Sequence, residues 1–191
     1  MLLCYASCSS LLTRRTCVMS TAQPTKRRTR PLDGTAYALS TGLGAGFAPI
    51  APGTVGSLEG VGIFLAVFAL HLALPASLLL LAILNILMFA VGVWASTRTC
   101  EITGLKDPRI VVIDEVSGQL IALTPLALWP SFSIAAVVLG FLLFRLFDIF
   151  KPYPIRKLEH LHAGLGVMAD DALAGIYAAV LLWLGHIVRL I

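Results

Sequence analysis

Five long apolar segments constrain the fold of this 191-residue chain more than any other feature. They cover residues 58–74, 76–96, 110–129, 131–150 and 172–191. A helix needs about 20 apolar residues to cross a bilayer, with a range of roughly 17 to 25, so each segment is long enough to span one. Only 13% of the residues are charged, against about 25% in an ordinary soluble domain. The sequence therefore predicts an all-α protein, a polytopic membrane bundle of about five apolar helices.

The loops between these segments differ in charge. Two of them, at Pro75 and Pro130, carry none, and the other two are basic, with Arg98, Lys106 and Arg109 in one and Lys151, Arg156 and Lys157 in the other. Basic loops stay in the cytoplasm when a helical membrane protein inserts. The pattern predicts a cytoplasmic N-terminus, a C-terminus on the opposite side, and a cytoplasmic location for the polar groups beside the basic loops.

The first 31 residues differ from the rest of the chain. Six of the fourteen basic residues precede Asp33, so the net charge of +4 comes from this segment. It is rich in Ser, Thr and Arg and lacks helical periodicity, and we expect a mobile basic tail at 1–31 and a membrane-embedded domain at 32–191. A basic tail beside apolar helices is typical of a segment that faces anionic lipid. The sequence contains no nucleic-acid-binding module, so we expect no nucleic-acid partner.

The cysteines suggest no separate chemistry. Cys8 and Arg14 have the spacing of a thiol phosphatase loop, but no glycine lies between them and no strand precedes them. The four cysteines form no CxxC metal pair and no disulfide framework; they are Cys4, Cys8, Cys17 and Cys100.

A Gly- and Pro-rich loop at 40–57 precedes the first apolar segment. Such a loop, ending in Thr and Ser, presents backbone N–H groups and hydroxyls at the start of a helix, where an anion is stabilised. Phosphate is the anion expected here. A tight re-entrant turn whose glycines serve only packing explains the same residues equally well.

Two pairs of adjacent carboxylates lie at the ends of apolar segments. Asp114 and Glu115 are expected one turn inside a helix, where Gly118 allows a neighbouring helix to approach closely. Asp170 and Asp171 are expected at a helix start, where Asp170 could act as an N-cap and Asp171 could interact with the helix dipole.

Three further charged residues, between the two carboxylate pairs in the sequence, are spaced three residues apart. Arg145, Asp148 and Lys151 share one face of the expected fourth helix, which Pro152 terminates. An ionisable residue in an apolar span is costly and is a functional candidate, although Arg and Lys can also extend to the membrane surface.

Five carboxylates at one side of a bundle repel one another unless a divalent cation lies among them. Oxygen ligands alone favour Mg²⁺ over zinc, and His160 and His162 are secondary candidates for a metal because they lack thiol partners. With nearby cations and an amide-rich loop, the group is suited to phosphoryl transfer to water.

The main alternative is a small membrane transporter or channel with an intramembrane charge cluster, but charges along an ion path should be spread across the bilayer. A structural subunit would leave the paired carboxylates unexplained, and the motif of phosphatidyl-transferring enzymes is absent.

The same residues, in order, resemble the phosphatidylglycerophosphatase A family over about 35–191. The resemblance rests on Thr41-Gly42 to Pro49, Pro52-Gly53-Thr54, Gly56-Ser57, Asp114-Glu115, Gly118, Arg145, Asp148, Lys151-Pro152, Pro154, Arg156, His162, Gly164, Gly166 and Asp170-Asp171. It implies a Mg²⁺-dependent enzyme of phospholipid biosynthesis in the bacterial inner membrane, which removes the terminal phosphate of phosphatidylglycerophosphate and yields phosphatidylglycerol. Ala163 and Val116-Ser117 depart from the family pattern.

With the resemblance, the candidate residues take roles. We expect catalytic roles for Asp114, Glu115, Arg145, Asp148, Lys151 and Asp171. The expected metal ligands are Asp114, Glu115, Asp148, Asp170 and Asp171. Substrate binding is assigned to Thr41, Gly42, Pro52, Gly53, Thr54, Ser57, Arg156 and His162.

Overall fold

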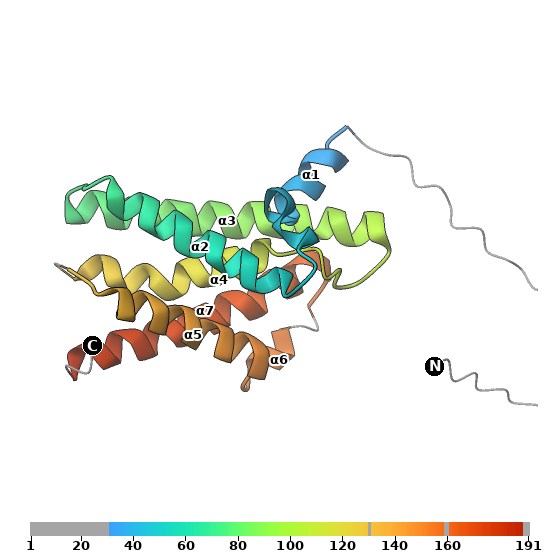
Figure 1. Cartoon of the computed structure of the whole chain (residues 1–191). Coiled ribbons are helices and arrows are strands. Elements are labelled where there is room, and N and C mark those ends of the chain that lie inside the picture. Colours follow the sequence, from blue (N-terminus) through green and yellow to red (C-terminus); the bar gives the residue numbers. More distant parts are fainter. Residues whose placement is uncertain (1–30, 130, 159–160, 189–191) are drawn as a thin grey trace, which may run out of the picture.

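The structure is a computed structural model of the chain, and it describes residues 31–129, 131–158 and 161–188. Regular structure in these ranges is helical throughout, and the longer helices run side by side in one bundle (Figure 1). In chain order the elements are α1 (Asp33–Ser40), η1 (Gly42–Phe47), α2 (Pro52–Ala69), α3 (Leu74–Thr103), α4 (Ile113–Leu123), η2 (Thr124–Leu128), α5 (Ile134–Phe150), α6 (Ile155–Leu158) and α7 (Ala163–Ile187), where η denotes a 3-10 helix. The expected tail lies outside the described residues, except for Pro31, and so does His160. Four residues discussed above belong to this part of the tail: Cys4, Cys8, Arg14 and Cys17.

Three helices are long and apolar enough to cross a membrane: α2, α3, and Gly164–Ile187 within α7. The other two expected spans are shorter. α5 has 17 residues, and the segment expected at 110–129 folds as α4, of 11 residues, followed by η2. Pro125 accounts for the change of helix type, because it has no N–H to donate to the carbonyl of Ile121. The structure supports an all-helical, membrane-associated protein, and the number of five spans remains a prediction.

Helix α4 lies at the centre of the bundle. All of its residues except Glu115 and Ile121 are buried. Glycines on its neighbours permit this burial: a Cβ at Gly60 of α2 would collide with the carbonyl of Val116 in α4, and one at Gly56 would collide with Val112, the residue just before α4. On the other side, a Cβ at Gly175 of α7 would overlap the carbonyl oxygen of Gly118. The expected close approach at Gly118 is therefore confirmed, and it brings the backbones of α4 and α7 into contact.

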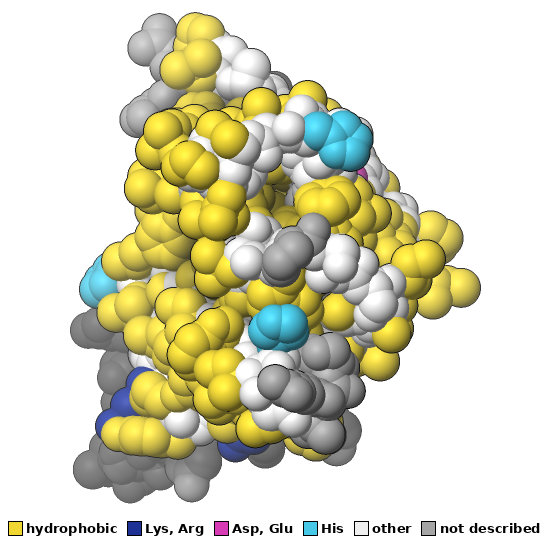
Figure 2. Space-filling view, turned by 90° about the vertical axis from the view of Figure 1, so that its left-hand side faces the viewer, with side chains coloured by type: hydrophobic (Ala, Val, Ile, Leu, Met, Phe, Trp, Pro, Cys, Tyr) yellow, Lys and Arg dark blue, Asp and Glu magenta, His cyan; other side chains and the backbone are white. Residues whose placement is uncertain are grey.

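Charged residues gather at one end of the bundle. Among the described residues, no Asp, Glu, Lys or Arg occurs in 60–97, 116–144 or 172–188. Figure 2 views the end formed by the α2–α3 loop and the end of α7, and hydrophobic side chains cover most of it. An uncharged body with charge at one end is the distribution expected of helices embedded in lipid.

The start of α2 differs from expectation. The helix begins at Pro52, where the fixed φ of proline suits a first helical turn, and not after Ser57. Gly53, Thr54 and Ser57 are consequently helical residues instead of loop residues.

The starts of α4 and α7 also differ. α4 begins at Ile113, so Asp114 and Glu115 lie in its first turn, not one turn inside it. α7 begins at Ala163, about two turns before Asp170. The interpretation of Asp170 as an N-cap is therefore wrong, because Asp170 lies inside α7.

Candidate active site

A cavity of about 440 Å³ opens at the charged end of the bundle. The start of α2, the α3–α4 loop with the start of α4, the end of α5, and α7 all contribute to its wall. The lining residues are Ala51, Pro52, Gly53, Asp107, Arg109, Val111, Asp114, Glu115, Asp148, Lys151, Val167, Asp170 and Asp171. Segments far apart in the sequence thus meet in one site. All five expected metal ligands lie on its wall.

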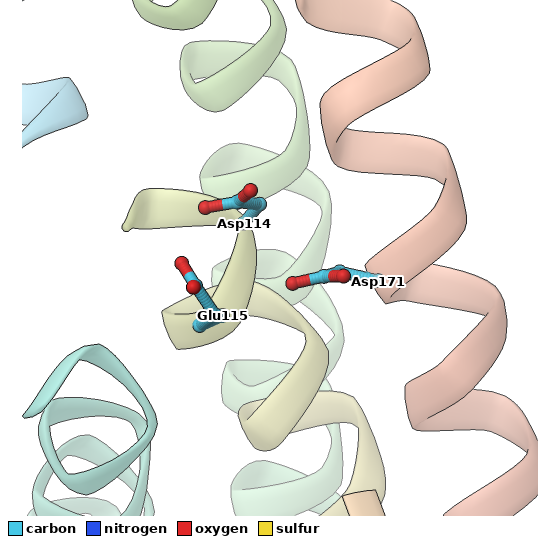
Figure 3. A group of neighbouring side chains, drawn as sticks. All are labelled: Asp114, Glu115 and Asp171. Atoms are coloured by element: carbon cyan, nitrogen blue, oxygen red, sulfur yellow. The ribbon is translucent and has the colours of Figure 1, made fainter. Parts of the chain in front are cut away.

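Three of these carboxylates form a compact group. Asp114 and Glu115 extend from the first turn of α4, and Asp171 extends toward them from α7 (Figure 3). One carboxylate oxygen of each lies within 4.8 Å of the others. Asp114 is 9% exposed and Asp171 is 3% exposed. Three acidic groups this close, two of them buried and Glu115 half-buried, repel one another in the ionised state.

The group has oxygens available to bind a cation. Asp114 Oδ1 and Glu115 Oε2 are buried, and neither has a hydrogen-bond partner among the described residues. An unsatisfied buried carboxylate oxygen is costly, and a divalent cation would remove that cost. A ligand set made only of oxygens suits Mg²⁺, Ca²⁺ or Mn²⁺. The chain therefore offers a fitting metal site at Asp114, Glu115 and Asp171.

Asp170 is held differently from these three. Its Oδ2 accepts a hydrogen bond from Lys151 Nζ at 2.6 Å, and its Oδ1 accepts one from the backbone N–H of Asp171 at 3.1 Å. Lys151 follows the end of α5 in a left-handed conformation, with φ 42°, a strained backbone state for a residue other than glycine. Lys151 therefore does not continue the helical face of Arg145 and Asp148, and it faces α7 instead.

Arg145 and Asp148 do share a face of α5. Arg145 Nη1 lies 2.7 Å from Asp148 Oδ2, and it also donates to Ser57 Oγ at 3.4 Å. Ser57 donates in turn to the carbonyl of Gly53 at 2.9 Å. This chain of contacts connects α5 to the first turns of α2 and fixes the Arg145 side chain beside the cavity.

Gly53 is needed where it lies. A Cβ there would overlap Glu115 Oε1 and would come within 3.3 Å of Arg145 Nη1. The packing interpretation of the Gly- and Pro-rich stretch thus holds at Gly53. The start of α2 has no side-chain cap, but Pro52 has no N–H, and the N–H groups of Thr54 and Val55 donate to the carbonyl of Ala51. The N–H of Gly53, on the cavity wall, is therefore the first-turn donor left for an anion.

The other expected substrate-binding residues do not line the cavity. Thr41 is buried and donates to the carbonyl of Ala38 at 3.2 Å. Gly42 packs against Glu59 and Val112. The remaining residues are also away from the wall: Thr54 is half-buried, His162 is exposed just before α7, and exposed Arg156 donates to the carbonyl of Phe150 at 3.3 Å.

Two charged residues on the wall had no assigned role in the site. Asp107 and Arg109 belong to the α3–α4 loop. The sequence signal was their position shortly before Asp114, but Arg109 served only to orient the chain in the membrane.

Comparisons with known proteins identify the family of the chain. The family model described as Phosphatidylglycerophosphatase A matches residues 38–186. A protein of Bacteroides thetaiotaomicron, provisionally named a phosphatidylinositol-3-phosphatase, is 42% identical over 147 residues, covering 75% of this chain and 89% of that protein. Proteins named Phosphatidylglycerophosphatase A from Escherichia coli and Haemophilus influenzae are 34% and 38% identical; the alignments cover 78% and 77% of this chain and 83% and 86% of those proteins.

No solved structure matches the chain significantly. The family match covers the whole carboxylate group, both paired cations and the start of α2. This chain belongs to the phosphatidylglycerophosphatase A family.

Proposed function

We propose that this protein hydrolyses the terminal phosphate monoester of phosphatidylglycerophosphate, with Mg²⁺ as cofactor, at the cytoplasmic face of a bacterial inner membrane. The products are phosphatidylglycerol and phosphate. One observation carries the proposal: carboxylates with unpartnered, buried oxygens line one cavity together with Lys151, and the Arg145–Asp148 ion pair reaches its wall through Asp148, at the charged end of an otherwise apolar bundle.

The substrate's two ends suit the two parts of the molecule. Exposed apolar side chains such as Leu146, Ile149 and Phe150 surround the end of α5 next to Lys151. Acyl chains can therefore stay in the lipid while the headgroup reaches the cavity. A phosphate monoester carries more negative charge than a diester, so it interacts more strongly with Lys151, Arg145 and the N–H of Gly53 at the start of α2.

The reaction is displacement at phosphorus by water. A new bond forms between the water oxygen and phosphorus, the bond to the glycerol oxygen breaks, and that oxygen takes up the proton that the attacking water has lost. A carboxylate of the group accepts the water's proton, while Lys151 and Arg145 balance the charge on the phosphoryl oxygens. The pairs Lys151–Asp170 and Arg145–Asp148 keep both cations in place before substrate arrives.

Asp114, Glu115 and Asp171 are the residues that would hold Mg²⁺, with Asp148 beside them on the wall. When bound, Mg²⁺ supplies Lewis-acid polarisation of the phosphoryl group and activation of water. Asp170 contributes by orienting Lys151.

A second lipid, phosphatidylinositol 3-phosphate, has support from the name of the Bacteroides relative. It also carries a terminal monoester and an internal diester. A transporter or channel is less consistent with the structure, because the charges of the described residues gather at one end instead of following a path across the bundle.

Phosphate release by the purified protein tests the proposal. The substrates are phosphatidylglycerophosphate, phosphatidylinositol 3-phosphate and phosphatidic acid in mixed micelles, each with Mg²⁺ and with a chelator. We expect the highest kcat/KM for phosphatidylglycerophosphate, and no release with chelator. A higher kcat/KM for phosphatidylinositol 3-phosphate would replace the proposed substrate with that lipid.

A further inference from the structure

Arg109 differs from the other two cations of the candidate site, Lys151 on the cavity wall and Arg145 beside it. Lys151 is paired with Asp170, and Arg145 with Asp148. Arg109 lies on the cavity wall, and no ion pair within the described part of the chain involves it. Its charge is therefore available to an anionic ligand.

The backbone around Arg109 is anchored on both sides. The N–H of Val111 donates to the carbonyl of Pro108 at 2.9 Å, and the N–H of Val112 donates to the carbonyl of Ser40 at 2.9 Å. Gly46 packs so closely on the carbonyl of Ile110 that a Cβ there would overlap it. Arg109 thus extends from an ordered loop. Binding of a ligand by Arg109 therefore costs less conformational entropy than binding by a residue on a mobile loop.

Depth separates Arg109 from the carboxylate group. Asp114 and Asp171 are buried, whereas Arg109 is exposed. The reacting phosphate must reach the buried carboxylates, so a group at the exposed rim meets a different part of the headgroup. In phosphatidylglycerophosphate that part contains a second phosphate, the diester, which one glycerol unit separates from the terminal monoester.

We propose that Arg109 binds the diester phosphate of the substrate and makes the enzyme prefer lipids with both a monoester and a diester phosphate over phosphatidic acid, which has only the monoester. This inference rests on the proposed function. Arg is suited to the role because its planar guanidinium binds two phosphate oxygens at once.

Asp107 is the charge that opposes this arrangement. It is exposed, lies two residues before Arg109 and also lines the cavity. A carboxylate at the rim repels a diester phosphate, so it weakens the binding that Arg109 provides. The two residues should therefore affect the preference in opposite directions.

The test compares kcat and KM for phosphatidylglycerophosphate and phosphatidic acid, in mixed micelles with Mg²⁺. The full-length variants are Arg109→Gln, Arg109→Lys and Asp107→Asn, and Lys106→Gln is the matched control, because Lys106 is exposed in the same loop but does not line the cavity. For Arg109→Gln we expect kcat/KM on phosphatidylglycerophosphate to fall roughly tenfold, mainly through KM, as for loss of a charge-assisted hydrogen bond. On phosphatidic acid we expect a change of less than about twofold, since that lipid has no diester phosphate beside a glycerol.

The other variants are expected to separate charge from folding. The preference is the ratio of kcat/KM for phosphatidylglycerophosphate to kcat/KM for phosphatidic acid. Arg109→Lys should keep part of the preference that Arg109→Gln loses. Asp107→Asn should keep or increase the preference, and Lys106→Gln should leave it unchanged. Equal losses on both lipids in Arg109→Gln, or an unchanged preference, would overturn the inference. The inference would also be overturned if Asp107→Asn lowered the preference for phosphatidylglycerophosphate as much as Arg109→Gln does. If wild type hydrolyses neither lipid, the proposed function itself is wrong; if wild type is active, these outcomes concern Arg109 alone.

Discussion

The carbonyl oxygen of Gly118 in α4 occupies the space where a side chain on Gly175 of α7 would begin. This backbone contact sets the separation of the two helices that carry Asp114 and Asp171. The carboxylate group therefore depends on a glycine that carries no functional group itself and lies about one turn from Asp171.

Gly175→Ala should push α7 away from α4 and weaken the site. We expect a loss of stability on the order of 1–3 kcal/mol, typical of overpacking, and a weaker apparent affinity for Mg²⁺. Thermal unfolding in detergent, with and without Mg²⁺, measures both effects. Gly62→Ala is the matched control, because nothing lies within 4 Å of a Cβ at that helical position. Equal stability and Mg²⁺ response in the two variants would show that the α4–α7 contact does not set the site.

Asp114→Asn and Asp171→Asn should each lower kcat by roughly a hundredfold or more, because each removes a carboxylate that we propose acts in the transition state. Neither change alters side-chain size, so we expect normal insertion and yield. Steady-state phosphate release over a range of Mg²⁺ concentrations is the measurement. Glu59→Gln, a half-buried acid of α2 outside the cavity wall, serves as the control. Wild-type turnover in either Asp variant would remove that carboxylate from the site.

Lys151→Met should destabilise the protein because it leaves the buried Asp170 without its 2.6 Å partner. Side-chain exposures of 24% and 6% place the pair between a surface and a buried ion pair, so we expect a loss of about 1–3 kcal/mol. Adding Asp170→Asn should restore part of the stability but none of the activity, since the cation is still missing. Denaturation midpoints and phosphate release are measured for wild type, the single variants Lys151→Met and Asp170→Asn, and the double variant, which together form a double-mutant cycle. Additive stability losses would show that the two residues are not coupled.

The sequence singles out most of the charged residues of the cavity because charges are conspicuous in apolar helices. Asp114, Glu115, Asp148, Lys151, Asp170 and Asp171 all lie on one cavity wall. Hydropathy does not show where a helix begins, and the starts of α2 and α7 were therefore placed several residues too late. Pairings across the bundle are set by packing: the left-handed Lys151 faces Asp170 instead of continuing the face of Arg145. Nothing in the sequence marks Arg109 as part of the site, because an arginine in a basic loop is typical of a membrane protein, whatever its role.

Membrane orientation gives an independent prediction. Basic loops at one end and uncharged loops at Pro75 and Pro130 predict a cytoplasmic site and a C-terminus on the other side. A reporter fused after Ile191 should be active only when it functions outside the cytoplasm. A fusion active only in the cytoplasm would mean an even number of spans or the reverse orientation.

Product analysis tests the central claim, a Mg²⁺-dependent monoester phosphatase, most directly. Purified protein is incubated with phosphatidylglycerophosphate and Mg²⁺, and the lipid products are identified by mass. We predict phosphatidylglycerol and one equivalent of phosphate, with no reaction after chelation and recovery when Mg²⁺ is restored. Diacylglycerol as the product, or phosphate release that chelation leaves unchanged, would contradict the account.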